Sequence, residues 1–124
     1  QLSTPDMCLP IQYALLYPER IRSDRVQTNF AKIGQLSFEE PDTDRFPALA
    51  LARRAGEVGG TLPAVLNAAN EVAVERFCAR QLGFSGIARL VTQVMEAHRV
   101  VDQPGLEQIL EADRWARAET SRMG

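Results

Sequence analysis

The chain has 124 residues, of which 45% are hydrophobic, so it is long enough for one compact domain with a real core and too short for two. Its 14 Lys and Arg residues are nearly balanced by 16 Asp and Glu residues, and a net charge of -2 without a basic stripe argues against nucleic acid as a partner. The sequence shows neither an apolar run long enough for a membrane span nor a signal peptide, so a soluble, cytoplasmic protein without membrane contact is expected.

The first 43 residues predict an irregular arm. They contain four of the seven prolines and only one plausible short helix, around Leu9 to Tyr17. The segment 36–38, Leu-Ser-Phe, predicts a short strand that ends at the acidic run beginning with Glu39. Because the chain opens on Gln1 and runs directly into a proline-bearing phrase, we expect it to be part of a longer protein.

From residue 44 onward the spacing of apolar residues predicts four helices. Asp44 is expected to cap the first helix, which ends at Gly59–Gly60, and Thr61 starts the second. Ser85 is expected to cap the third helix and Pro104 to open the fourth. Short links between them favour a mainly α fold, with an antiparallel four-helix bundle behind the irregular arm. The expected inward residues are Phe46, Leu49, Ala52 and Ala55; Leu62, Val65, Leu66, Ala69, Val72, Ala73 and Phe77; Ile87, Leu90, Val91, Val94 and Met95; and Leu106, Ile109, Leu110, Ala112, Trp115 and Ala116.

An acidic run offers one candidate metal site. Glu39, Glu40, Asp42 and Asp44 carry the oxygen ligands that divalent cations prefer. Pro41 interrupts the run, and the spacing differs from that of a metal-binding loop. A solvated turn leading into a helix cap is therefore the favoured interpretation, and no metal ligand is predicted in this chain.

Other chemically active residues are sparse. His98, the single histidine, is expected near the end of the third helix, where a partial positive charge suits the helix dipole. No Ser or Cys nucleophile is placed to use it. Trp115 stands near two arginines, but ordinary packing explains it better than a cation–aromatic surface. Cys8 and Cys78 lack the spacing of a zinc site or a disulfide scaffold, which fits a reducing compartment.

Three polar residues interrupt the most apolar helix. Asn67, Asn70 and Glu71 share helical spacing, so at least one amide is expected to be inside or half inside and to need hydrogen-bond partners. A ligand would supply these partners, as would a loop or the end of a neighbouring helix, and we favour the structural role. The sequence contains no glycine-rich dinucleotide loop and no catalytic triad, so the residues by themselves name no reaction.

Four phrases of the sequence occur together in one family of enzymes. The opening QLSTPDMCLPIQYAL, followed by YPER at 17–20, is similar to the family segment Q-L-x-x-P-D-M-[RK]-x-P-I. LSFEEPD at 36–42 leads to RFP at 45–47, LNAANE occupies 66–71, and Asp113 precedes the pair Ala116-Arg117, all in the family order. With these phrases the chain resembles 1-deoxy-D-xylulose 5-phosphate reductoisomerases. Cys8 departs from the family pattern because it replaces the usual basic residue.

The resemblance implies a parent oxidoreductase of non-mevalonate isoprene biosynthesis. That family rearranges 1-deoxy-D-xylulose 5-phosphate and reduces the intermediate with NADPH to 2-C-methyl-D-erythritol 4-phosphate. A divalent metal (Mg²⁺, Mn²⁺ or Co²⁺) holds the substrate oxygens. The dinucleotide-binding domain and the metal-binding carboxylates lie upstream of the segment that matches Gln1. The resemblance therefore implies no catalytic residue and no metal ligand within these 124 residues.

For this chain the resemblance implies three segments: residues 1–17 as the tail of the catalytic, connective domain, 18–43 as a linker, and 44–124 as the C-terminal helical bundle. Pro5 and Met7 are expected to form apolar wall beside the nicotinamide. The resemblance also favours a structural role for the 67–71 motif. The partners would be the rest of the enzyme and, through it, a second copy in a homodimer.

Two alternatives differ in class from this expectation. A truncated gene would encode a free-standing helical protein-interaction module, recognisable by a start codon next to this segment and by a partner in a pull-down. A small ligand-binding bundle would use the amides of the 67–71 motif and would melt at a higher temperature with its ligand. The reductoisomerase interpretation predicts instead that the chain alone is inactive.

Overall fold

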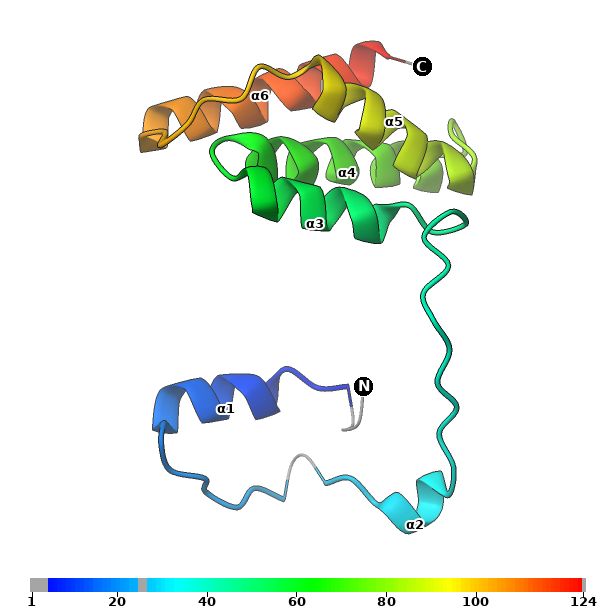
Figure 1. Ribbon diagram of the computed structural model, residues 1–124, viewed down its shortest axis with the longest axis vertical. Coiled ribbons are helices and arrows are strands. Elements are labelled where there is room, and N and C mark those ends of the chain that lie inside the picture. The colour runs from blue at the N-terminus through cyan, green and yellow to red at the C-terminus, as the bar shows by residue number, and fades with distance from the viewer. Residues whose placement is uncertain (1–4, 25–26, 124) are drawn as a thin grey trace. The chain divides into compact units, whose positions relative to one another are not determined.

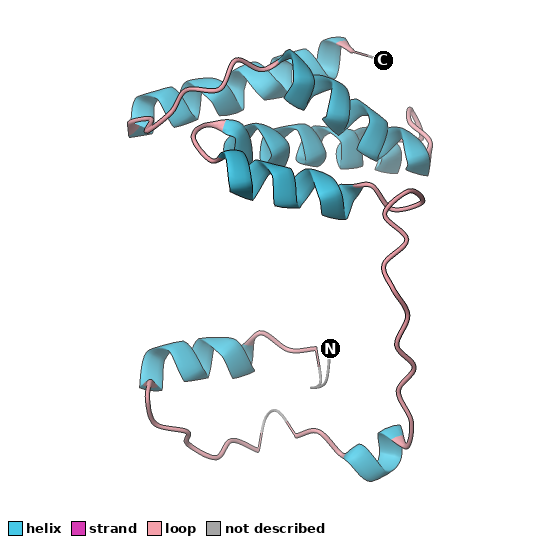
Figure 2. Cartoon of the chain, viewed as in Figure 1, coloured by secondary structure: helices cyan, strands magenta, loops and turns pink. Residues whose placement is uncertain are grey.

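The computed structural model describes residues 5–24 and 27–123. Within these ranges it contains helices and irregular segments but no strand (Figures 1 and 2). The chain divides into two compact units between Glu40 and Pro41, and each unit is described by itself. None of the described helices is both long and apolar enough to cross a membrane.

The first unit contains helix α1, Cys8–Leu16, and the single-turn helix α2, Phe30–Ile33. Helix α1 confirms the short helix predicted in the arm. A carboxylate oxygen of Asp6 accepts a hydrogen bond from the backbone N–H of Cys8 at 2.7 Å, which satisfies one of the unpaired donors at the start of α1. Helix α2 was not predicted, and it is one turn capped by the Asn29 side chain at the N–H of Lys32 (3.0 Å).

The strand predicted at 36–38 is wrong. These residues, Leu-Ser-Phe, are irregular, and the side chain of Phe38 is 81% exposed. A strand persists only when its backbone groups pair with a neighbouring segment, and no such pairing is formed by the described part of the chain. The residue types at 36–38 favour an extended backbone, but a strand also needs a neighbouring segment to pair with.

The second unit is the predicted four-helix bundle. Its helices are α3 (Ala48–Val58), α4 (Leu62–Cys78), α5 (Phe84–Ala97) and α6 (Leu106–Arg122). Successive helices alternate in direction (Figure 1), and α4 lies in the centre, in contact with the other three. This arrangement confirms the mainly α, antiparallel bundle.

Several helix ends differ from the prediction. Asp44 does not cap α3, because the carboxylate of Asp42 instead accepts the N–H of Arg45 (2.9 Å) in a turn that precedes the helix. The N-cap of α5 is Gly83 rather than Ser85. The N-cap of α6 is Gly105, whose N–H is bonded to the side chain of Gln108 at 2.9 Å. The predicted stop after α3 is confirmed, since Gly59 and Gly60 have φ of 69° and 56°.

The core confirms most predicted inward residues, and the exceptions belong to the first, second and fourth predicted helices. In α3 the buried residues are Leu51 and Ala55, which lie four apart. The inward face was predicted at three-residue steps, so it points to a different side of the helix, and Phe46, Leu49 and Ala52 are exposed. In α6 burial begins at Ala112, which leaves the first turns exposed. The predicted inward residues that are exposed are Phe46, Leu49, Ala52, Phe77, Leu106 and Leu110. The buried hydrophobic residues are Leu51, Ala55, Leu62, Val65, Ala68, Ala69, Val72, Ala73, Leu90, Val91, Val94, Met95, Ala112 and Ala116.

Candidate functional site

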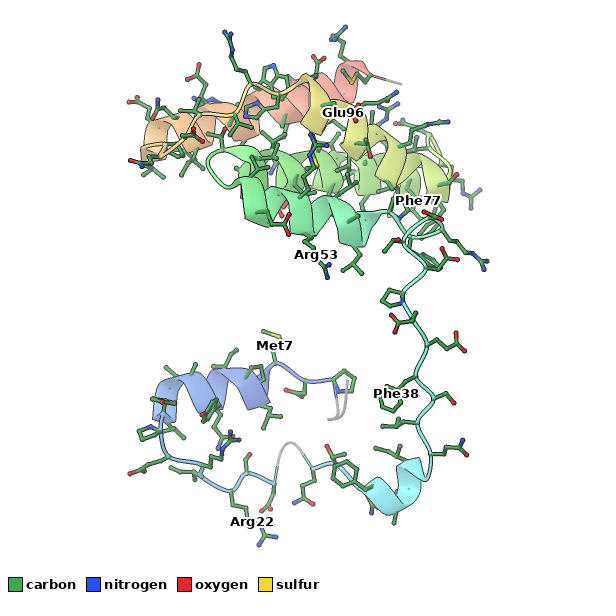
Figure 3. The ribbon with its side chains drawn as sticks, in the orientation of Figure 1. Met7, Arg22, Phe38, Arg53, Phe77 and Glu96 are labelled. Carbon is green, nitrogen blue, oxygen red and sulfur yellow. The ribbon has the colours of Figure 1, made fainter. Side chains whose placement is uncertain are left out.

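A pocket of about 640 Å³ lies at the start of α1 and contains both predicted wall residues. Met7 precedes the helix, and its side chain is 70% exposed and projects from the start of α1 (Figure 3). Pro5 lines the same pocket. Neither side chain exchanges protons, so together they offer a surface for apolar contact. The lining residues are Pro5, Asp6, Met7, Leu9, Pro10, Tyr13 and Arg20.

The lining of this pocket also includes a cation, Arg20. The guanidinium carbon of Arg20 lies 4.2 Å from the ring centroid of Tyr13, a cation–π distance. The amide of Gln12 donates to the carbonyl oxygen of Ile21 at 2.8 Å, which holds the segment after α1 beside the helix. The pocket therefore combines apolar wall with one guanidinium that is available to an anionic group.

Glu71 of the 67–71 motif connects α4 to α6. The carboxylate of Glu71 accepts from the Asn67 amide at 2.9 Å and from the guanidinium of Arg117 at 2.7 Å. Arg117 also donates to Asp113, one turn earlier in α6, at 2.8 Å. The hydrogen bond from Arg117, and then that from Asn67, lower the pKa of Glu71. The expectation that an amide of this motif is inside or half inside is wrong, because Asn67 and Asn70 are both exposed.

Both asparagines line a second cavity, of about 510 Å³, within the bundle unit. Its walls come from α3, α4, α5 and the turn before α3. Phe46 and Phe84, two exposed aromatic residues of this unit, lie on it. Asn67 thus donates to Glu71 within α4 and also borders this cavity.

His98 is held by a hydrogen bond and by an aromatic contact. Its Nε2 lies 2.7 Å from the hydroxyl of Thr61, and its ring lies 5.0 Å from that of Trp115, centroid to centroid. Burial lowers the pKa of His98, so the positive charge expected at the end of α5 is not favoured. Trp115 packs against the core, as expected. The role of Thr61 was missed, although its place directly after two glycines was a signal for a tight junction.

Across 5–24 and 27–123, no group of three His, Cys, Asp or Glu side chains is placed to hold a metal ion. In the acidic run, the Asp42 side chain accepts the N–H of Arg45 in an exposed turn, which confirms the predicted turn, whereas the predicted helix cap at Asp44 is wrong.

Comparison with known proteins settles the family. Residues 2–119 match the family model described as DXP reductoisomerase C-terminal domain. The chain belongs to this family. It is 59% identical over 117 residues to a 1-deoxy-D-xylulose 5-phosphate reductoisomerase of Pelotomaculum thermopropionicum, and 56% identical over 117 residues to that of Symbiobacterium thermophilum. Each match covers 94% of this chain but 30% of the relative, so the chain spans about a third of the length of these enzymes.

Solved structures show the same fold for this DXP reductoisomerase C-terminal domain. The reductoisomerase of Zymomonas mobilis in complex with NADPH superimposes with a TM-score of 0.85 at 37% identity, over 99% of this chain and 32% of the other. A DOX-P reductoisomerase in complex with magnesium gives a TM-score of 0.83 at 38% identity, over 98% and 33% of the two chains. The structural match includes the first unit as well as the bundle.

One departure from the reductoisomerase pattern lies beside the first pocket. Cys8 is exposed at the start of α1, where the family phrase has Arg or Lys. The first four residues of that phrase lie outside the described residues. Arg20 lines the pocket and supplies a cation there, so the missing charge at position 8 does not leave the pocket without one.

Proposed function

We propose that this chain is the C-terminal part of an NADPH-dependent 1-deoxy-D-xylulose 5-phosphate reductoisomerase of non-mevalonate isoprenoid biosynthesis. The observation that carries the proposal is the match of residues 2–119 to the family's C-terminal domain, together with 59% identity to an enzyme of which the chain covers 30%. The whole enzyme rearranges its substrate and reduces the product of that step to 2-C-methyl-D-erythritol 4-phosphate. The chemistry depends on residues outside this chain.

The chain contributes three segments to that enzyme. Residues 1–17 form the tail of the catalytic domain, 18–43 a linker, and 44–124 the bundle that braces the molecule. The hydrogen bond between Arg117 and Glu71 supports the bracing role, because it connects α6 to α4 within the bundle. Asn67, Asn70 and Glu71 are structural residues in this proposal.

Pro5 and Met7 form apolar wall of the nicotinamide pocket. Bound NADPH supplies a hydride to the substrate. These two side chains would pack on the nicotinamide ring and exclude water from that face, and their shared pocket at the start of α1 supports this role. The divalent metal, Mg²⁺, Mn²⁺ or Co²⁺, would be held by residues elsewhere in the enzyme, because Asp6 is the one carboxylate that lines this pocket and such ions take several oxygen ligands.

The partners are the rest of the enzyme and a second copy of it in a cytoplasmic homodimer. Helix α1 supports the first of these, because it is apolar and contains no buried residue. Its residues Leu9, Ile11 and Leu15 are 41%, 50% and 79% exposed. A helix that is apolar on every side is stable in water only when other parts of a protein cover it.

The purified 124-residue chain tests this proposal. With substrate, NADPH and Mn²⁺, the absorbance of NADPH is expected to stay constant while circular dichroism shows a helical protein. Turnover by the chain alone would overturn the assignment of catalysis to absent residues. A stable complex with an unrelated protein, with no gain of activity from the rest of the enzyme, would favour the free-standing interaction module.

A further inference from the structure

A single threonine joins two connections of the bundle. Thr61 follows the turn between α3 and α4, and its N–H donates to the carbonyl oxygen of Val101 (3.2 Å) in the connection between α5 and α6. Its hydroxyl oxygen in turn accepts the N–H of Val101 at 3.1 Å. The two connections approach so closely at Gly60 that a Cβ there would lie 2.4 Å from the Val101 oxygen.

The geometry around Thr61 fixes the protonation state of His98. The Thr61 hydroxyl has one hydrogen to donate, and its oxygen already accepts from Val101. The Thr61 side chain is 0% exposed, so water does not take the hydrogen. The available acceptor is Nε2 of His98 at 2.7 Å, which requires a neutral imidazole with its proton on Nδ1.

We propose that the Thr61–His98 hydrogen bond is a proton-sensitive latch, in which the neutral imidazole holds the α5–α6 connection on the α3–α4 turn and protonation of Nε2 releases it. Protonated Nε2 is a donor. The Thr61 oxygen would then face two donors, from His98 and Val101, while its own hydrogen lost its acceptor in a buried site. Leaving a buried polar group unpaired is unfavourable, so the contact opens.

The charged side chains near His98 do not reverse the preference of its imidazole for the neutral form. The small cavity beside the ring, of about 350 Å³, is lined by one cation, Arg99 from the α5–α6 connection, and by one anion, Glu111 from α6. Both side chains are exposed, and they act in opposite directions. Burial is the cause that lowers the pKa of His98, so the latch is closed at neutral pH.

Because the pKa of His98 is lowered in the folded chain, acidification reduces the stability that the latch contributes. The folded chain binds the His98 proton less well than the unfolded chain does, so the unfolded state holds more protons as the pH falls below about 6.5, the ordinary value for histidine. The stability that the latch contributes is therefore fully present above about pH 6.5 and is lost on acidification through the lower pKa of the folded state.

NMR on the full 124-residue chain tests the latch, and the single histidine makes the imidazole signals unambiguous. The midpoint of the His98 titration is expected below that of a free histidine. The hydrogen-exchange protection of the Val101 amide, corrected for the intrinsic effect of pH, should fall about tenfold or more across the same interval. His98→Gln keeps an acceptor that does not titrate, so its Val101 protection should be independent of pH there.

Two further results decide the proposal. Thr61→Val removes the hydroxyl that accepts from Val101 and bonds His98, so its Val101 amide should be poorly protected at every pH, and Glu111→Gln, a control on the exposed anion, should preserve the pH-dependent loss of Val101 protection. A His98 midpoint at or above the free value would overturn the latch. So would Val101 protection that is unchanged across the titration, or that falls equally in His98→Gln. If Thr61→Val fails to fold, the comparison of the native chain with His98→Gln remains decisive.

Discussion

Arg117 of α6 donates to Glu71 of α4 across 2.7 Å, while its Nε binds Asp113 at 2.8 Å in its own helix. Asp113 therefore holds the guanidinium in position for Glu71. The two hydrogen bonds to carboxylates raise the pKa of Arg117 above its ordinary range, with the bond to Asp113 the larger cause. Glu71 of the LNAANE phrase thus takes part in a contact between the two longest helices of the bundle.

Glu71→Gln should lower the melting temperature slightly, because it removes one charge from an exposed ion pair. The effect belongs to the pH range in which Glu71 is ionised. Since the folded-state pKa of Glu71 is lowered, its contribution is present above the usual glutamate range and is lost as the pH falls through the folded value. Thermal melts at neutral and acidic pH measure it.

Glu75→Gln, on the same helix and also exposed, is the matched control. It should leave the melting temperature nearly unchanged at both pH values. Equal effects of Glu71→Gln and Glu75→Gln would show that the ion pair with Arg117 contributes nothing specific.

A substitution in the core of the bundle should reduce stability more than a substitution in the exposed ion pair. Met95 is 2% exposed, and Met95→Ala should lower the free energy of unfolding by ~2–5 kcal/mol because it leaves a cavity. Leu106, predicted as inward but 72% exposed, is the control, and Leu106→Ala should stay within about 0.5 kcal/mol of the native chain. Chemical denaturation of both variants measures the difference, and comparable losses would contradict the observed packing of α6.

The two adjacent glycines should respond differently to alanine. Both have positive φ, so either substitution introduces backbone strain of ~1–3 kcal/mol. Gly60→Ala also places a Cβ against the backbone of Val101, whereas the space around Gly59 is open. Denaturation should therefore show Gly60→Ala as clearly less stable than Gly59→Ala, and the reverse order would contradict the close approach of the two connections.

Met7 tests the proposed cofactor pocket in the complete enzyme. Met7→Ala should raise KM for NADPH several-fold, because it removes apolar surface from the pocket, and Met7→Leu should largely restore it because volume and polarity are kept. Steady-state kinetics with varied NADPH measure both variants. An unchanged KM in Met7→Ala, with the enzyme folded, would remove Met7 from the nicotinamide wall.

Periodicity predicted the bundle better than it predicted details at its ends. Val65, Ala69 and Val94 are fully buried, as their three- and four-residue spacing required. In α3 the inward face was assigned from Phe46 in three-residue steps, but the helix begins only at Ala48 and buries Leu51 and Ala55. The packing partner, which local sequence does not contain, selected the rotation.

Some residues of the candidate sites were predicted from the sequence, and others were not. The family phrase drew attention to Pro5 and Met7, and the structure places them in one pocket, although their contact with NADPH stays a prediction. Neither Arg117 as the partner of Glu71 nor Thr61 as the partner of His98 was predicted. These pairs are separated by 46 and 37 residues, and only the tertiary fold brings them together.

A chimeric enzyme tests the central claim most directly. In it, this chain replaces the matching C-terminal 30% of the Pelotomaculum thermopropionicum reductoisomerase, to which it is 59% identical. NADPH oxidation with 1-deoxy-D-xylulose 5-phosphate and Mn²⁺ should approach that of the native enzyme, while the same enzyme lacking this segment should be inactive. A folded, soluble chimera without turnover would contradict the account that this chain is the C-terminal part of a reductoisomerase.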